Sequence, residues 1–322
     1  MDATDLYAIP GLTDIHFHGC VGYDFCDGTH QATEAMAIYE AKNGITSICP
    51  ATMTLGDDSL HQIFKNAGTY ESKKGAMLVG INMEGPYLCM AKKGAQNGDF
   101  LKKPDVEHFR KMNEYSNHLI KLVSIAPEEE GSMEFIKELK DEVVLSVAHT
   151  AADYDIAAEA FKHGASHVTH LYNAMPSFTH RAPGVVGAAF DASHSHVELI
   201  CDGVHIHPSV VRATFQLFGD NRVILVSDSM MATGLEDGEY ALGGQPVSVR
   251  GNLATLADGT IAGSATNLMK CMKTAVSFGI PIESAIKSAA VNPAKAIGVY
   301  DKVGSITKGK FANIVLLDRG LN

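Results

Sequence analysis

The sequence contains no apolar run long enough to cross a lipid bilayer, and no basic stretch followed by an apolar one at its start. A transmembrane helix needs about 20 consecutive apolar residues, and a secretory leader needs that basic-then-apolar order. Low-complexity tracts and short-period repeats are also absent, and charged residues make up 20% of the chain. These absences argue against membrane-spanning, disordered and repeat proteins, and they predict a soluble, cytoplasmic protein that binds no membrane.

Blocks of lysine and arginine are missing too, and the formal net charge at pH 7 is −11. A nucleic-acid-binding protein needs clustered cations to neutralise phosphates, so this composition argues against nucleic acid as a partner. It leaves room for a small anionic substrate held by a few local cations. The six cysteines include no CxxC pair and no dense framework, which fits a reducing compartment.

Histidine, in contrast, is abundant: the chain has 15, and eight of them lie between His163 and His207. Histidine is the commonest metal ligand and the usual acid or base near neutral pH, so this clustering favours a metal or acid–base site. With 322 residues and 46% hydrophobic content, the chain buries a large core, as one large domain or as a domain with a small appendage.

Short apolar runs alternate with helix-like stretches along most of the chain. The amphipathic stretches at 33–44 and 153–164 each end in glycine, a common helix stop signal. Near-continuous apolar strands between helices indicate a parallel sheet covered on both faces, and eight such runs predict an α/β fold of the (β/α)8 barrel type. The predicted strands are 9–17, 46–52, 77–84, 119–127, 143–149, 166–171, 197–202 and 223–228.

The pattern changes after the eighth predicted strand. Residues 235–263 are rich in glycine and β-forming residues and predict hairpins, helices are expected over about 264–298, and one more strand over 310–318. We therefore expect two domains. A barrel domain covers 9–300 and carries a β-rich insertion near 235–262. A small second unit covers 303–322 together with the few residues before 9.

Side chains able to bind metal or transfer protons gather at the ends of the predicted strands. The carboxyl ends of the strands carry the active site in (β/α)8 barrels. In chain order these residues are His16 and His18 at the first strand, Glu84 at the third, His149 at the fifth, His170 at the sixth, His205 after the seventh and Asp228 at the eighth. Several such groups at one end of successive strands are far less expected by chance than an isolated pair.

The pair His16 and His18 lies in the segment DIHFHG at 14–19. Strand side chains alternate between faces, so the two imidazoles point to the same side. The spacing alone is weak evidence, because residues 194–196 and 205–207 share it and most such pairs are structural. Asp14 and the predicted strand end favour metal ligation here, whereas the pair at 194–196 precedes its strand and is expected to be structural.

Two carboxylates complete the candidate site. Glu84 lies between an apolar strand and a Gly-Pro turn, where an unpaired buried carboxylate is costly; alone, it indicates a salt bridge or a helix cap. With His149 and His170 it forms a carboxylate and two-histidine set, which leaves positions open for water, as catalytic metal sites do. Asp228, in SDSMMATG, is a candidate general base for an activated water, and an N-cap is an equally good interpretation of that motif alone.

The motifs occur together in one known family. PGLTDIHFHG, NMEGPY followed by KKGAQ, VAHT, THLYNAMPSFTHRAPG, CDGVHIHP, VSDSMMATG and GTIAGSA run in family order from about residue 10 to the segment at 303–318. THLYNAM with its downstream Arg-x-Pro-Gly is the most specific of these segments. The chain resembles the N-acetylglucosamine-6-phosphate deacetylase family of the amidohydrolase superfamily.

The resemblance implies a role for each part of the site. Glu84, His149 and His170 would hold the principal divalent metal, zinc or iron(II) before manganese or cobalt, and Asp228 would activate water and protonate the departing amine. The substrate would be a 6-phosphorylated N-acetyl amino sugar, and the protein a homodimer. The residues implied to contact substrate are Ala95, Gln96, Asn173, Ala174, Arg181, Asp202, His205, Ile261, Ala262 and Gly263.

Three positions call for comment within this resemblance. Family members that keep both histidines of the HxH pair hold two metals, so His16 and His18 predict a second, weaker site. Gln96 stands where some members have a histidine that polarises the acetyl carbonyl, and glutamine donates a hydrogen bond without carrying charge. Arg181 suits phosphate, because its guanidinium group matches two phosphate oxygens.

The amino-terminal region departs from the family pattern. Family members usually begin with several strands before PGxxD, whereas PGLTD starts at Pro10 here. We therefore expect an incomplete β-sandwich with an exposed apolar edge, which weakens stability or promotes association.

Two alternative functions remain open at this stage. Another amidohydrolase, acting on a cyclic amide, an N-acyl amino acid or a nucleobase, fits the metal site, although Arg181 and THLYNAM favour a phosphosugar. A catalytically impaired phosphosugar-binding protein is the alternative from another class, and the intact set of metal-competent residues and Asp228 argues against it.

Overall fold

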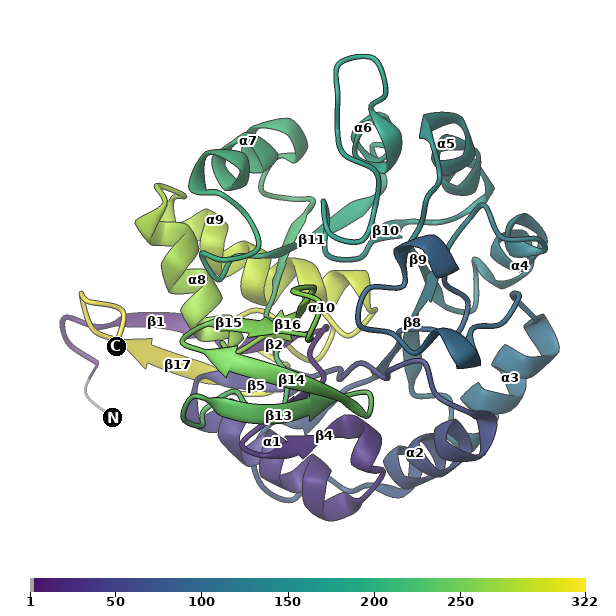
Figure 1. Ribbon diagram of the computed structural model, residues 1–322. Coiled ribbons are helices and arrows are strands. Elements are labelled where there is room, and N and C mark those ends of the chain that lie inside the picture. The colour runs from purple at the N-terminus through teal and green to yellow at the C-terminus, as the bar shows by residue number, and fades with distance from the viewer. Residues whose placement is uncertain (1–2) are drawn as a thin grey trace.

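The computed structural model describes residues 3–322, in which parallel strands form a barrel (Figure 1). Strands β7 to β12 form one six-stranded run in chain order, and β2, β5 and β6 form a second. The barrel strands are β2 (Leu12–Asp14), β5 (Ile45–Ile48), β6 (Met77–Leu78), β7 (Ile81–Met83), β8 (Ile120–Ile125), β9 (Val144–Val147), β10 (His167–Val168), β11 (His196–Ile200) and β12 (Val223–Val226). Each predicted barrel strand is present, so the predicted α/β barrel is confirmed.

Two predicted strands are interrupted. The run 77–84 divides into β6 and β7, and the run 9–17 divides at Gly11 into β1 (Tyr7–Pro10) and β2. Gly11 packs so closely that a Cβ atom there would lie 2.2 Å from Thr46 Oγ1. Strand β2 then ends at Asp14, so His16 and His18 follow the strand instead of lying within it.

Backbone contacts at the carboxyl ends of the strands close the barrel. A bridge between Ala51 and Asn82 connects the segment after β5 with β7. On the opposite side, Asp228 N donates to His16 O at 2.8 Å, which joins the ends of β2 and β12. The carboxyl ends of the first and last barrel strands therefore meet at the barrel mouth.

Helices surround the barrel strands in Figure 1. Their boundaries follow local signals: the Asp153 side chain accepts from Ile156 N at the start of α5, and Gly164, with φ of +129°, ends it. The outer helices are α1 (His30–Lys42), α2 (Asp57–Thr69), α3 (Val106–Tyr115), α4 (Ser132–Leu139), α5 (Tyr154–His163), α6 (Gly184–Asp191) and α7 (Pro208–Phe218). The predicted helical region near 264–298 contains α8 (Leu268–Ser277), α9 (Ile282–Ile286), a π-helical turn (Lys287–Val291) and α10 (Asn292–Ala296).

The predicted hairpins form a four-stranded antiparallel sheet, with strand order β13-β14-β15-β16. The strands are β13 (Gly238–Leu242), β14 (Gln245–Arg250), β15 (Leu253–Thr255) and β16 (Ile261–Ser264). Met53 and Met230 from the barrel mouth pack with Leu242, Val247 and Ala262 of this sheet in one apolar cluster. The sheet therefore covers part of the mouth, in green in Figure 1.

Strand β1 pairs outside the barrel, antiparallel to β17 (Ile314–Leu317). Tyr7 lies opposite Leu317 and Pro10 opposite Ile314. Apolar side chains are exposed around this pair, among them Tyr7, Phe311 and Ile314. Within residues 3–322, no helix has both the length and the apolar character needed to cross a membrane.

Short elements connect these units. Strands β3 (Gly19–Cys20) and β4 (Tyr23–Asp24) form a small antiparallel pair after the His16 and His18 segment. Short 3-10 helices cover Phe25–Asp27, Met90–Lys92 and Gly98–Phe100. The last two flank Gln96 at the barrel mouth.

Candidate active site

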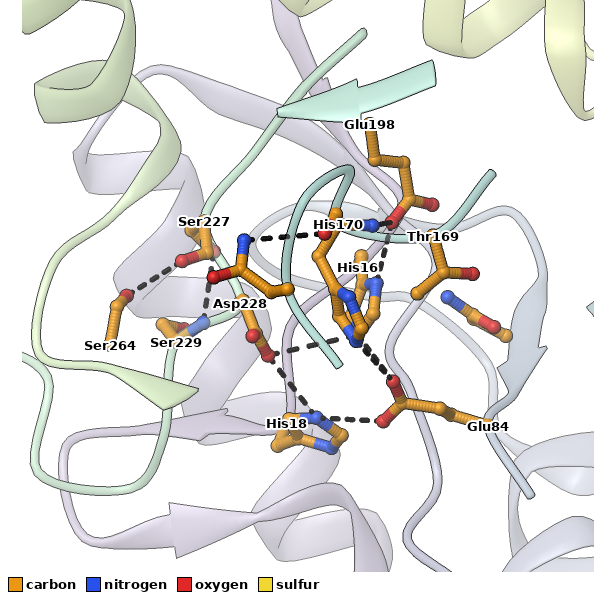
Figure 2. Close-up of polar contacts among 12 residues, drawn as sticks. His16, His18, Glu84, Thr169, His170, Glu198, Ser227, Asp228, Ser229 and Ser264 are labelled. Carbon is orange, nitrogen blue, oxygen red and sulfur yellow. Dashed lines mark hydrogen bonds and ion pairs between the residues drawn. The ribbon is translucent and has the colours of Figure 1, made fainter. Parts of the chain in front are cut away.

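Imidazole rings and carboxylates converge at the barrel mouth, as the close-up in Figure 2 shows for most of them. The residues are His16 and His18 after β2, Glu84 after β7, His149 after β9, His170 after β10 and Asp228 after β12. All of them are buried. The barrel thus brings together every metal-ligand candidate and the candidate base that the strand-end rule identified.

Glu84, His149 and His170 form a nearly equilateral triangle of ligand atoms. Glu84 Oε1 lies 3.2 Å from His149 Nε2 and 3.3 Å from His170 Nε2, and the two imidazole nitrogens are 3.1 Å apart. Ligands of a tetrahedral zinc ion with bonds of 2.0–2.1 Å are about 3.3 Å apart, so the triangle has the dimensions of a metal site.

A second group shares Glu84 with the first. His18 Nε2 lies 3.3 Å from both Glu84 Oε2 and Asp228 Oδ1. His16 Nε2 lies 3.4 Å from Glu84 Oε1 and 3.7 Å from Asp228 Oδ1. The Glu84 carboxylate therefore stands between two sets of ligand atoms and is placed to bridge two cations.

The chemistry of these donors fits divalent cations. His16 Nε2 is buried and has no hydrogen-bond partner among residues 3–322, although three carboxylate and imidazole groups surround it. The two imidazole nitrogens of His149 and His170 share a 3.1 Å contact in which only one of them can donate. A cation between the ligand atoms satisfies all of these lone pairs at once, and mixed nitrogen and oxygen ligands accept several divalent metals.

Hydrogen bonds on the far side of the imidazoles fix their tautomers. His149 Nδ1 lies 2.9 Å from Lys92 O, so Nδ1 is the donor and Nε2 faces the cluster with its lone pair. His16 Nδ1 lies 2.7 Å from Glu198 Oε2 with the same consequence. Such outer contacts orient metal-binding histidines and make them better ligands.

Three of these residues have left-handed backbone conformations. The φ angles are +42° at His149, +28° at His170 and +49° at Asp228, a region that residues other than glycine rarely adopt. Each of the three comes two residues after the end of its barrel strand. Such conformations cost about 1–3 kcal/mol per residue and are typical of functional sites. Here the left-handed backbone directs each side chain into the barrel mouth.

The carboxylates create a strongly negative field in the site. Burial opposes a charged imidazole, yet hydrogen bonds and charge from Asp228 and Glu84 raise the pKa of His18 to about 10. Burial would raise the pKa of Asp228, but the neighbouring histidines His18 and His16 bring it below its usual value. A field that favours positive charge at these nitrogens also favours a divalent cation among them.

The side-chain amide of Gln96 is hydrogen-bonded to the Glu84 carboxylate. Gln96 Nε2 donates to Glu84 Oε2 at 2.8 Å, and Gln96 Oε1 accepts from Thr54 N at 2.7 Å. The residue was expected in the substrate pocket, and it does line the cavity described below. Its amide, however, orients the Glu84 carboxylate, a role that the sequence did not indicate.

The histidine and carboxylate cluster opens into a cavity of about 400 Å³. His18, Glu84, His149, His170 and Asp228 line it on the barrel side. Of the predicted substrate-contacting residues, Ala95, Gln96, Asn173, Ala174, His205, Ile261 and Gly263 line it as well. Ala262 is buried and packs in the apolar cluster under the sheet, so its backbone lies beside the cavity while its side chain points away from it.

Gly263 allows the sheet to approach the carboxyl end of β12. Its φ is +65°, and a Cβ atom there would lie 2.9 Å from Asp228 O. Ser264 N donates to that same oxygen at 2.7 Å. The sheet β13–β16 is therefore fixed directly to the backbone that carries Asp228.

Asp202 forms a hydrogen bond with the His205 imidazole. Asp202 Oδ2 lies 2.8 Å from His205 Nδ1, and Oδ1 accepts from the backbone N–H groups of Val204 and His205 at 2.9 Å each. Burial would lower the pKa of His205, and the Asp202 carboxylate raises it above its usual value. His205 therefore offers the cavity a hydrogen-bond donor with positive character, while Asp202 itself is outside the cavity lining.

Arg181 lies apart from this cavity. It is exposed and lines a separate hollow with Tyr154, Asp155 and Asp191.

His194 and His196, expected to be structural, do lie at the amino end of β11. His194 Nε2 contacts Ala165 O at 3.1 Å, and the His196 imidazole stacks on that of His167.

The sequence interpretation missed several residues of the site. Lys92 and Met53 line the cavity. Glu198 Oε2 lies 2.7 Å from His16 Nδ1. Asp14, already named from the sequence, accepts from Ser227 Oγ at 2.5 Å. A signal existed for Glu198: a carboxylate inside the apolar run VELIC is costly to bury unless it has polar partners.

The sequence matches the Amidohydrolase family over residues 7–321. The N-acetylglucosamine-6-phosphate deacetylase of Bacillus subtilis (strain 168) is 39% identical over 320 residues, covering 97% of this chain and 81% of that protein. The N-acetylgalactosamine-6-phosphate deacetylase of Escherichia coli O157:H7 is 32% identical over 317 residues, covering 97% of this chain and 84% of that protein.

A solved structure agrees with these relatives. A mutant N-acetyl-D-glucosamine-6-phosphate deacetylase of Mycobacterium smegmatis, in complex with N-acetyl-D-glucosamine-6-phosphate, matches with a TM-score of 0.92 at 33% identity. The match covers 98% of this chain and 84% of that one. Family, relatives and fold agree with the motifs, and the chain therefore belongs to the amidohydrolase family.

Proposed function

We propose that the protein hydrolyses the acetamide of N-acetylglucosamine 6-phosphate to glucosamine 6-phosphate and acetate, in amino-sugar catabolism. The observation that carries this proposal is the Glu84, His149 and His170 triangle at the base of a cavity that Asp228 also lines. Amide hydrolysis needs a nucleophilic water, a polarised carbonyl and an acid for the amine, and this set of groups can provide all three.

The metal proposal covers one principal and one weaker site. Glu84, His149 and His170 would hold the first divalent ion, and His16 and His18 with Glu84 the second. Zinc or iron(II) suits these ligands best, and manganese or cobalt is also compatible. A divalent cation held there polarises the amide carbonyl and lowers the pKa of a water molecule.

Asp228 carries the proton transfers in this proposal. Its carboxylate Oδ1 faces the Nε2 atoms of His16 and His18, and neighbouring histidines keep its pKa low, so it is ready to accept a proton. The proton taken from the attacking water then passes to the amine nitrogen as the C–N bond breaks. The sheet β13–β16 covers part of the barrel mouth, and its residues Leu242, Ile261 and Gly263 line the cavity.

Cationic groups on the cavity wall support a phosphorylated substrate. Among the described residues, Lys92 is the only lysine or arginine that lines the cavity, and His205 lines it with a raised pKa. We propose that the phosphate contacts His205. Arg181 is exposed outside the cavity. Its proposed phosphate contact therefore requires the proposed homodimer, in which Arg181 of each copy would reach the cavity of the other copy.

Comparison of acetate release from four compounds tests the substrate proposal. We expect the metal-loaded protein to prefer N-acetylglucosamine 6-phosphate over N-acetylgalactosamine 6-phosphate, unphosphorylated N-acetylglucosamine and an N-acetyl amino acid. The galactose epimer is included because a 32% identical relative is named for it. A higher kcat/KM for the N-acetyl amino acid would favour another amidohydrolase, and metal binding without acetate release would favour a phosphosugar-binding protein.

Gln96→Ala is expected to lower kcat about tenfold, because an unsupported Glu84 carboxylate still binds metal but less rigidly. Loss of an outer contact of this kind costs about 10–100-fold. Steady-state kinetics measure the change, with Gln245→Ala as control, because Gln245 donates to Ala95 O beside Gln96 without touching Glu84. A loss as large as that of Asp228→Asn would contradict this ranking.

The double variant His16→Gln/His18→Asn is expected to reduce the bound metal from two ions per chain to one. The Glu84, His149 and His170 set stays intact in it, so the principal ion remains. Elemental analysis after dialysis measures the stoichiometry. One ion per chain in both the wild-type and the double variant would show that the second site is not formed.

Domain organisation, association and location complete the proposal. Within residues 3–322, strands β1 and β17 pair only with each other, which supports a remnant of a small β-sandwich at 303–322, with the few residues before 9, beside a barrel domain of 9–300. The exposed apolar residues around this pair favour association. All six cysteines are free, which supports a reducing, cytoplasmic location.

A further inference from the structure

Glu198 lies on β11 and is fully buried, and Figure 2 shows its carboxylate next to His16 and His170. One carboxylate oxygen, Oε2, lies 2.7 Å from His16 Nδ1 and accepts from His170 N at 3.2 Å. The other oxygen, Oε1, lies 3.0 Å from His167 Nε2. Glu198 therefore contacts one member of each proposed ligand set and one histidine outside both.

A carboxylate at this position is costly for folding. Ile200 on the same face of the strand packs in an apolar cluster inside the barrel, and an unpaired carboxylate on that face would lose its hydration without compensation. Three donors replace that hydration here. An apolar residue would fill the same position of a barrel strand more cheaply, so the carboxylate calls for a role beyond packing.

The hydrogen bond to Glu198 determines which nitrogen of His16 carries the proton. A carboxylate only accepts, so Nδ1 of His16 carries a proton, and in the neutral ring the lone pair lies on Nε2. That Nε2 atom has no hydrogen-bond partner and faces Glu84 Oε1 at 3.4 Å and Asp228 Oδ1 at 3.7 Å. The opposite tautomer would direct a proton into the space between these ligand atoms.

We propose that Glu198 is a positioning residue that gives the second metal ion its affinity, by holding His16 in the ligating tautomer and orientation. This inference rests on the proposed metal-dependent function. The same oxygen also holds the backbone of His170, whose φ is +28°, so Glu198 links the two ligand sets from behind. The principal site depends on it less, because His149 and Glu84 are held by other partners.

Glu198→Gln tests this role with almost no change in side-chain volume. We expect the second metal ion to bind about 10–100-fold more weakly and the first to bind within about threefold of wild type, as for other outer partners of metal-binding histidines. Competition against a chromophoric zinc chelator measures both affinities. The matched control is His167→Gln, which alters the same buried network without touching His16, and we expect it to keep both affinities within about threefold.

Equal weakening in Glu198→Gln and His167→Gln would show a merely structural role and overturn the inference. Unchanged binding of two ions by a folded Glu198→Gln variant would also overturn it. Acetate release by the wild-type protein is measured separately. Absence of acetate release would contradict the proposed function, whereas the metal affinities alone test the role of Glu198.

A measurement on the wild-type protein covers the case in which Glu198→Gln fails to fold. Multiple-bond 1H–15N spectra of zinc-loaded protein labelled at histidine nitrogens report which nitrogen carries the proton. We expect His16, identified through the spectrum of His16→Gln, to be protonated at Nδ1 and metal-bound at Nε2. Protonation at Nε2, or a His16 imidazole that does not respond to zinc, would overturn the proposal.

Discussion

Asp228→Asn is expected to lower kcat for acetate release by about 10³–10⁴-fold, the largest loss from any single proton-transfer group in the site. Asparagine has almost the same shape and still fills the position beside His16 and His18, but its amide cannot take the proton of the attacking water. KM and metal content are expected to stay within about threefold of wild type. Steady-state kinetics and elemental analysis measure the three quantities.

Asp24→Asn provides the matched control. Asp24 is a buried aspartate whose charge acts on His18, but it caps the turn at Phe25–Asp27 and does not line the cavity. We expect kcat within about fivefold of wild type. An Asp228→Asn enzyme that retains more than a tenth of wild-type kcat would remove Asp228 from the proton-transfer role.

Glu84→Gln is expected to deprive the protein of both metal ions, because Glu84 is the residue shared by the two ligand sets. The amide keeps one weak oxygen ligand but loses the negative charge that faces four imidazoles. Lewis acidity contributes several kcal/mol to such a reaction and about 1.4 kcal/mol corresponds to tenfold, so kcat/KM should fall at least about 10³-fold. Metal counting and acetate release measure the two effects.

Glu40→Gln separates metal loss from the loss of a buried carboxylate in general. Glu40 lies on α1, is fully buried, and neither of its carboxylate oxygens has a hydrogen-bond partner. Burial raises its pKa well above the usual value, so glutamine removes a charge that this position already disfavours. We expect two ions per chain in Glu40→Gln. Two ions in Glu84→Gln as well would contradict the bridging position assigned to Glu84.

The strand-end rule explains why so much of the site could be predicted. Glu84, His149, His170 and Asp228 each follow an apolar run, and a parallel barrel places the ends of all such runs at one mouth. Strand alternation does not explain the placement of His16 and His18, because β2 ends at Asp14, although both Nε2 atoms do face Asp228 Oδ1. Topology was sufficient for Glu84, His149, His170 and Asp228.

Features that depend on long-range packing were beyond such patterns. Gln96 reaches back to Glu84 because the 3-10 helices on either side of it fold over the mouth, and no local signal gives that direction. Glu198 contacts His16, from which it is 182 positions distant in the chain. Arg181 carries a phosphate-binding group but lies on an exposed segment outside the cavity, which residue type alone cannot reveal.

The central claim, metal-dependent release of acetate from N-acetylglucosamine 6-phosphate, is tested most directly by titrating metal back into chelator-treated protein. We expect the treated protein to release no acetate, and the rate to rise with added zinc or iron(II) until the principal site is filled, at one ion per chain. Any further rise up to two ions would report the second site. An acetate-release rate that is the same with and without metal, or that stays at the uncatalysed level in metal-restored protein, would contradict the account.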